Sequence, residues 1–299
     1  MIRVSGLTKK FGALKALDGL NFECDPGEMV ALVGPNGSGK STALKIMAGI
    51  MRQNKGEVRF GDDLMTISSA QLRNRISYLP QRVAFPDQAT AKEMLTFFAK
   101  LRRIGKERIA ELFTAFGFEG FETKTVAELS GGMLQRLALA VVLLPRADLY
   151  LLDEATNNLD AEGLERFREL ISAALERGAS IVLSTHILKE VENLADRIAI
   201  VSAGRIVRMD KIERFVNEVN HSRRMWMKLE NLSERYRELA LDMGAREAVL
   251  NCNTMTVECE EEQRIPILNA LAREGAAIKD FGIYEPSLED VYKQALRDH

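Results

Sequence analysis

Apolar and polar residues alternate in short segments at the beginning of the chain, which predicts strands joined by turns. Residues 20–24 alternate in this way, residues 25–28 contain an Asp-Pro-Gly turn signal, and residues 29–33 form a continuous apolar run of buried-strand length. From about 88 to 145 apolar residues recur at helical spacing, after a Thr-x-x-Glu capping box at residues 90–93. We therefore expect short strands followed by a helical subdomain.

Buried strands return in the second half of the chain. Residues 149–152 and 181–184 are unbroken apolar runs, separated by an expected helix at about 161–176. Such runs are typical of a parallel sheet that is covered on both faces. Residues 197–201 and 205–208 flank a Ser-Ala-Gly turn, which predicts a hairpin at the edge of that sheet. The fold class is therefore α/β.

The end of the chain has a pattern of its own. A charged stretch at about 211–224 predicts a linker, after which strands and helices follow in the order βαββαβ, the split βαβ plan. The strands are expected at 225–229, 246–250, 254–259 and 277–284, the helices at 231–243 and 261–273, and a last helix at about 287–297. We predict two domains, residues 1–210 and residues 225–299.

Composition and charge narrow the possible functions. The 299 residues suffice for about two domains of ordinary size. Lys and Arg total 41 and Asp and Glu 43, so the formal net charge is −2 and no bulk positive field favours a nucleic acid. The three cysteines and three histidines show no metal-site spacing. The longest apolar run, residues 137–144, is too short to cross a bilayer, and the start lacks a signal-peptide pattern. We therefore expect a cytoplasmic protein.

A glycine-rich segment carries the clearest chemical signal. It matches the phosphate-loop pattern G-x-x-x-x-G-K-[ST] and lies between the strand at 29–33 and an expected helix at 42–48. Glycines let successive backbone N–H groups turn inward at a helix N-terminus, which makes an anion site. We expect Lys40 between the β- and γ-phosphates and the Ser41 hydroxyl on Mg²⁺. The loop residues expected to bind the nucleotide are Gly34, Pro35, Asn36, Gly37, Ser38, Gly39, Lys40, Ser41 and Thr42.

Two carboxylates follow the apolar run at 149–152. Asp153 is placed beside the phosphate loop to hold Mg²⁺, because that ion prefers few carboxylates together with phosphate oxygens. Glu154 points elsewhere and can orient or deprotonate an attacking water. An Asp-Glu pair after a strand is by itself usually a helix cap, and the phosphate loop favours the catalytic interpretation.

A third motif, Leu-Ser-Gly-Gly-Met at residues 129–133, opens an apolar helix. Ser130, Gly131 and Gly132 would form a second anion site at a helix N-terminus, and one nucleotide rarely needs two such sites from the same subunit. Together the motifs resemble the nucleotide-binding subunit of ABC transporters, whose signature is L-S-G-G-Q. Met133 departs from that signature, which puts in doubt a water-mediated contact through this side chain.

The resemblance covers about residues 1–220 and implies a fold and an assembly. The fold would be a P-loop NTPase core of ABC type with an antiparallel β subdomain and a helical signature subdomain, followed by a small α+β domain of the ferredoxin-like type. In this family two copies pack head to tail, and each ATP lies between the phosphate loop of one copy and the signature residues of the other. The resemblance also implies that Phe11 stacks on adenine and that Gln81 touches Mg²⁺ and its water. Residues 157–160, which include Asp160, would form the loop that crosses the dimer interface, and His186 would hold the γ-phosphate and Glu154.

Residues 286–292, Pro-Ser-Leu-Glu-Asp-Val-Tyr, resemble the C-terminal domains of ABC subunits that serve two-component (ABC-2 type) exporters. Together with the motifs, this implies a cytoplasmic ATPase on the inner face of the cell membrane that powers a separate permease for export. The charge balance gives no support to a nucleic acid partner. An alternative is a soluble ABC ATPase acting on ribosomes or DNA, which the single phosphate loop disfavours. Another is a regulatory module without turnover, which Glu154 and His186 disfavour. The sequence leaves the cargo open. It also leaves open whether the second ATPase is another copy of this chain or a related protein, and whether the tail stabilises the dimer or senses a ligand.

Overall fold

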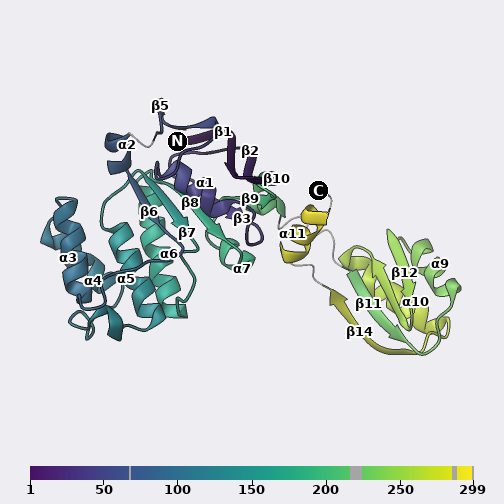
Figure 1. The fold of residues 1–299 in the computed structure, drawn as a ribbon. Coiled ribbons are helices and arrows are strands. Elements are labelled where there is room, and N and C mark those ends of the chain that lie inside the picture. Colours follow the sequence, from purple (N-terminus) through teal and green to yellow (C-terminus); the bar gives the residue numbers. More distant parts are fainter. Residues whose placement is uncertain (67–68, 216–223, 285–287, 298–299) are drawn as a thin grey trace. The chain divides into compact units, whose positions relative to one another are not determined.

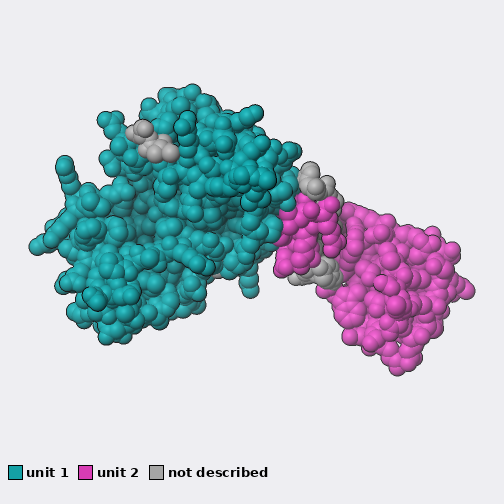
Figure 2. Space-filling model, in the orientation of Figure 1, with its two compact units in different colours: residues 1–212 teal, residues 213–299 magenta. Residues whose placement is uncertain are grey.

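The computed structural model describes residues 1–66, 69–215, 224–284 and 288–297. The chain divides into two compact units, Met1–Ile212 and Glu213–His299, which are coloured separately in Figure 2. The expected linker at 211–224 falls largely on residues 216–223, which lie outside the described residues.

A six-stranded sheet with the order β10-β9-β3-β8-β7-β6 forms the centre of unit 1 (Figure 1). Its strands are β3 (Met29–Val33), β6 (Ile76–Leu79), β7 (Leu149–Asp153), β8 (Ser180–Thr185), β9 (Arg197–Ser202) and β10 (Arg205–Lys211). All neighbours are parallel except β9 and β10, which form the hairpin expected at the sheet edge. Every residue of β3, β7 and β8 is buried, as the unbroken apolar runs predict.

A second sheet of unit 1 is antiparallel and has the order β2-β1-β4-β5. Its strands are β1 (Ile2–Phe11), β2 (Leu14–Cys24), β4 (Lys55–Phe60) and β5 (Asp63–Leu64). The buried side chains Leu7 and Leu20 of this sheet share one hydrophobic cluster with Leu32 of the six-stranded sheet. The antiparallel subdomain is therefore packed onto the core that carries the phosphate loop.

The helices of unit 1 include a group on one side of the six-stranded sheet (Figure 1). This group is α3 (Ala91–Leu101), α4 (Lys106–Ala115), the 3₁₀ turn η1 (Val126–Glu128) and α5 (Gly131–Leu143). The capping box at the start of α3 is confirmed, because Thr90 Oγ1 accepts from Glu93 N at 3.2 Å while Glu93 Oε2 accepts from Thr90 N at 2.8 Å. The remaining helices are α1 (Lys40–Met47), α2 (Ala70–Asn74), α6 (Ala161–Glu176) and α7 (Leu188–Val191).

Unit 2 contains a four-stranded antiparallel sheet with the order β12-β13-β11-β14. The elements are β11 (Arg224–Leu229), α9 (Glu234–Asp242), β12 (Glu247–Asn251), β13 (Thr254–Glu258), α10 (Glu261–Arg273), β14 (Ile278–Tyr284) and α11 (Leu288–Arg297). The order up to β14 is the split βαβ order that the sequence predicts. Tyr236 of α9 and Ile267 of α10 belong to one hydrophobic cluster with the sheet residues Met225, Met227 and Met255. Among the described residues, no helix has both the length and the apolar character needed to span a bilayer.

Candidate active site

The phosphate loop connects the buried strand β3 to the N-terminus of α1. Gly39 has a φ of +107°, and a Cβ at this position would overlap Ala16 O and lie 2.8 Å from Leu17 Cδ2. The loop therefore runs so close to β2 that a side chain at this position does not fit. The loop leads into the N-terminus of α1, where the first N–H groups of a helix have no partner within the helix and suit an anion.

Lys40 begins α1 and lies over the phosphate loop. Its buried Nζ donates to Gly34 O at 2.7 Å and to Pro35 O at 3.0 Å. Burial lowers the pKa of Lys40, and the nearby carboxylates of Glu154 and Asp153 oppose this shift. The carbonyl oxygens of Gly34 and Pro35 thus hold the ammonium group at the loop.

A pocket of about 440 Å³ opens beside the loop, within the usual size of a small-molecule site. The predicted residues that line it are Phe11, Asn36, Gly37, Ser38, Gly39, Lys40, Ser41, Thr42, Gln81 and Glu154. Phe11 is 46% exposed, so its ring is available to a flat ligand. Leu14 and Ala16 of β2 also line the pocket, although no motif in the sequence indicates them. For Leu14, its position three residues after Phe11 is a weak signal that it lies near the same pocket.

Asp153 ends β7 next to the first turn of α1. Its Oδ1 accepts from Ser41 Oγ at 3.0 Å and from Ser184 Oγ. The described residues offer no hydrogen-bond partner to the buried Oδ2. A buried carboxylate oxygen without a partner is costly, and a divalent cation would satisfy it. A carboxylate beside a hydroxyl is also a donor set that Mg²⁺ accepts, so Asp153 and Ser41 fit this ion.

Glu154 follows Asp153 in a strained backbone conformation. Its φ is +53°, which is uncommon for a residue with a side chain and occurs at functional sites. The Oε2 atom accepts from Gln81 Nε2 at 3.1 Å and from Asn157 Nδ2 at 2.6 Å, and Oε1 lies 3.4 Å from His186 Nδ1. The structure thus brings Glu154, Gln81 and His186 together. Asn157 belongs to the expected interface loop at 157–160, and its hydrogen bond to Glu154 of the same copy was not predicted from the sequence.

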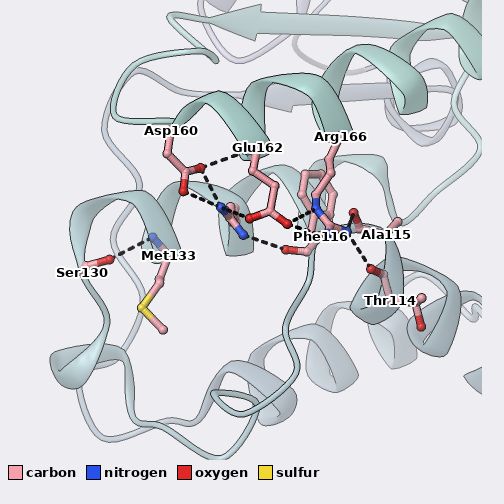
Figure 3. Close-up of polar contacts among 10 residues, drawn as sticks. Thr114, Ala115, Phe116, Ser130, Met133, Asp160, Glu162 and Arg166 are labelled. Carbon is pink, nitrogen blue, oxygen red and sulfur yellow. Dashed lines mark hydrogen bonds and ion pairs between the residues drawn. The ribbon is translucent and has the colours of Figure 1, made fainter.

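The signature residues lie at the beginning of α5. Ser130 is the N-cap, and its Oγ accepts from Met133 N at 3.3 Å (Figure 3). Gly131 and Gly132 form the first turn of α5. The pocket lining that the described residues make does not include these three positions. Within one copy, the two expected anion sites are therefore separate.

Asp160 has partners within its own unit. It is the N-cap of α6, where Oδ1 accepts from Gly163 N at 2.9 Å, and both carboxylate oxygens accept from Arg136 Nη2 at 2.6 and 2.7 Å (Figure 3). The Arg136 guanidinium lowers the pKa of Asp160. Asp160 is expected at the nucleotide site, yet the described lining of the pocket does not include it.

Known proteins similar to this chain belong to the same family that the motifs indicate. The family described as ABC transporter matches residues 17–157. The daunorubicin resistance ATP-binding protein DrrA3 of Streptomyces coeruleorubidus is 28% identical over 99% of this chain and 96% of its own length. The bacitracin transport ATP-binding protein BcrA of Bacillus licheniformis is 35% identical over 69% of this chain and 68% of its own length.

Solved structures are similar over the region that carries the site. The ATP-binding subunit of an ABC transporter superposes with a TM-score of 0.68 at 27% identity, covering 74% of this chain and 93% of that chain. A dimeric bacterial ABC transporter cassette superposes with a TM-score of 0.66 at 26% identity, covering 71% of this chain and 99% of that chain. The chain therefore belongs to the ATP-binding proteins of ABC transporters, ATPases whose cofactors are ATP and Mg²⁺.

Proposed function

We propose that the chain is the ATP-hydrolysing subunit of an exporter and powers a separate membrane permease. The observation that carries the hydrolytic part is the position of Glu154, a buried carboxylate beside the phosphate loop that Gln81, Asn157 and His186 surround. Export is supported by the name of DrrA3, a resistance protein that is similar over nearly the full length of both chains. The permease is a separate chain in this proposal, and it holds the ATPase at the inner face of the membrane.

The side chains divide the work of phosphoryl transfer among them. Lys40 and the N–H groups of the loop bind the phosphates of ATP. Ser41 and Asp153 would hold Mg²⁺, which would supply positive charge against those phosphates. Glu154 accepts a proton from water while the water oxygen bonds to the γ-phosphorus and the bond to the ADP oxygen breaks. His186 and Gln81 orient Glu154 and the reacting groups. Phe11 stacks on the adenine at the exposed end of the pocket.

Two copies of the chain complete each site in a head-to-tail dimer. Ser130 caps a 13-residue helix whose first turn contains Gly131 and Gly132, and the helix dipole at such an N-terminus favours an anion. These three residues are separate from the pocket of their own copy, so we assign them to the phosphates in the pocket of the second copy. The dimeric cassette among the similar structures supports this assembly. ATP that binds both copies favours the closed dimer, and hydrolysis removes that preference.

The two compact units support separate roles for the two parts of the chain. We assign nucleotide binding to residues 1–210, with the helical subdomain at about 88–145, and an accessory role to residues 225–299. Residues 211–224 link the two. Permease subunits, rather than a nucleic acid, are the proposed further partner, and the formal net charge of −2 supports this choice.

The substitution Glu154→Gln tests the proposal. ATP binding should persist, because the phosphate loop is unchanged, while steady-state hydrolysis is lost and a nucleotide-bound dimer accumulates in size-exclusion chromatography. Glu165→Gln is the matched control, since it makes the same change of charge on an exposed position of α6. Unchanged turnover in Glu154→Gln would refute the assignment. Recovery of the native protein with ribosomes or DNA instead of membranes would refute the permease partner.

A further inference from the structure

Helix α5 contacts the segment that follows Glu154 at three points. Gln135 Nε2 donates to Ala155 O at 2.7 Å, and Arg136 Nη2 donates to both carboxylate oxygens of Asp160. A Cβ built at Gly132 would lie 3.0 Å from Asn158 O, so the segment also lies against the first turn of the helix. Residues 155–160 are therefore fixed to α5 at the beginning, the middle and the end of the segment.

Arg136 is the strongest of these attachments. It is 9% exposed, and its Nη1 also donates to Phe116 O at 3.3 Å, near the end of α4. Charge-assisted bonds from one guanidinium to two carboxylate oxygens are stronger and more directional than neutral hydrogen bonds. Asp160 is fixed further by its bond from Gly163 N, and a Cβ at Gly163 would lie 2.8 Å from Asp160 Oδ1. The side chain of Asp160 is thus held from two directions.

The other end of the segment reaches the carboxylate of Glu154. Asn157 Nδ2 donates to Glu154 Oε2 at 2.6 Å, and Gln81 donates to the same oxygen. Asn158 has a φ of +64°, so the segment contains a residue in the left-handed region, as does Glu154 directly before it. Such conformations persist only where the surroundings determine them. The position of Asn157 therefore depends on the attachments that hold the segment.

We propose that Arg136 is a positioning residue of the ATPase site. Through Asp160 it fixes the segment 155–160, and through Asn157 the segment holds Oε2 of Glu154, which leaves Oε1 directed toward His186. The inference rests on the proposed role of Glu154 in hydrolysis. It gives Asp160 a role within its own copy, as the partner of Arg136. A displacement of about 1 Å in a reacting group costs on the order of 100-fold in rate, so small shifts of the segment suffice to lower kcat.

A second arginine provides a matched control. Arg166 of α6 donates to Glu162 Oε1 at 2.7 and 3.2 Å and to the carbonyls of Thr114 and Ala115 at 3.1 and 2.9 Å (Figure 3). Those carbonyls lie beside the Phe116 carbonyl that Arg136 binds, so both arginines connect the end of α4 to neighbouring helices. These bonds of Arg166 do not involve the segment 155–160, and Glu162, which also lies 3.8 Å from Arg136 Nη2, is the one carboxylate that the described ion pairs of the two arginines share.

The test compares Arg136→Lys with Arg166→Lys by melting temperature, kcat and KM for ATP. Arg136 binds Asp160 through Nη2 and the Phe116 carbonyl through Nη1, and a lysine has only one nitrogen for both partners. Arg136→Lys should therefore lower kcat by about 10- to 100-fold with KM changed less than about threefold. Arg166→Lys should lower the melting temperature to a similar extent and leave kcat unchanged. Equal losses of kcat in both variants, or an unchanged kcat in Arg136→Lys, would overturn the proposal. Asp160→Asn removes the charge and one of the two acceptor oxygens of this contact and should lower kcat in the same direction.

A double-mutant cycle separates positioning from general damage. If Arg136 acts through Asn157, the double variant Arg136→Lys/Asn157→Ala should turn over no more slowly than the slower of the two single variants. Losses that multiply would overturn the proposal, because the two side chains would then act independently. Retained ATP turnover in Glu154→Gln would refute the proposed function itself. If Glu154→Gln is inactive but the losses of kcat from Arg136→Lys and Asn157→Ala multiply, only the proposed role of Arg136 is refuted.

Discussion

An alanine at Gly39 should disturb the phosphate loop in two ways at once. Gly39 has a φ of +107°, where an alanine costs about 1–2 kcal/mol relative to its relaxed backbone. The added Cβ would also overlap the backbone oxygen of Ala16 and lie 2.8 Å from Leu17 Cδ2. Leu17 is fully buried and Ala16 O belongs to strand β2, so neither atom can move cheaply. Overpacking of this kind costs about 1–3 kcal/mol, which makes the expected loss about 2–5 kcal/mol.

Gly37 offers the matched comparison in the same loop. Its φ is +81°, and no described heavy atom lies within 4 Å of a Cβ built there. Gly37→Ala therefore carries the backbone cost alone, about 1–2 kcal/mol. The difference between the two variants should be about 1–3 kcal/mol, which corresponds to about 2–12 °C in melting temperature for a domain of this size.

The assay is urea unfolding of both variants and of the unsubstituted chain, followed by circular dichroism without nucleotide. We expect Gly39→Ala to unfold at a lower urea concentration than Gly37→Ala at unchanged slope. Equal midpoints would refute the reasoning, since they would mean that the contact with β2 does not constrain the loop. A less stable Gly37→Ala would refute it as well.

Three further outcomes are expected. Phe11→Ala should raise KM for ATP about tenfold and leave kcat nearly unchanged, because the exposed ring contributes stacking alone; an unchanged KM would exclude the adenine contact. Cys252 is exposed and should react rapidly with a thiol reagent, whereas burial raises the pKa of Cys24 to about 12 and should protect it until urea unfolds the chain. Arg136 lowers the pKa of Asp160 below its ordinary value of 3.8, so the ionised carboxylate stabilises the folded chain at neutral pH and this contribution is lost as the pH falls through the lowered pKa. Asp160→Asn should therefore be less stable than the unsubstituted chain in urea at pH 7, and the gap should close on acidification; a gap that persists would contradict the lowered pKa.

Elements with strong local signals were predictable from the sequence. The bounds of α6 and α10 agree with the expected 161–176 and 261–273, because each helix begins after an acidic cap and has a regular apolar face. The bounds of strand β3 agree with the expected 29–33, since a five-residue apolar run between a turn and a phosphate loop is typical of a buried strand. Short elements such as α2 and β6 carry weak periodicity, and their sequence did not set them apart from the surrounding turns.

The candidate site was predictable where one motif supplies neighbouring residues. Most of the phosphate loop lines the pocket, and Ser41 meets Asp153, because strand order in a parallel sheet brings loop ends together. Contacts between side chains on different helices were not predictable. Arg136 and Asp160 are 24 residues apart, and only the packing of α5 against α6 brings them within hydrogen-bond distance. No spacing rule in the sequence gives that contact.

The most direct test of the two-copy site mixes two variants that are inactive alone. Lys40→Ala disables the phosphate loop and Ser130→Arg blocks the signature turn, so a mixed dimer has one site with both changes and one site with neither. If each ATP is held by the loop of one copy and the signature of the other, the mixture should regain ATPase activity that neither variant shows separately. A mixture that stays at the sum of its inactive components would contradict the shared site.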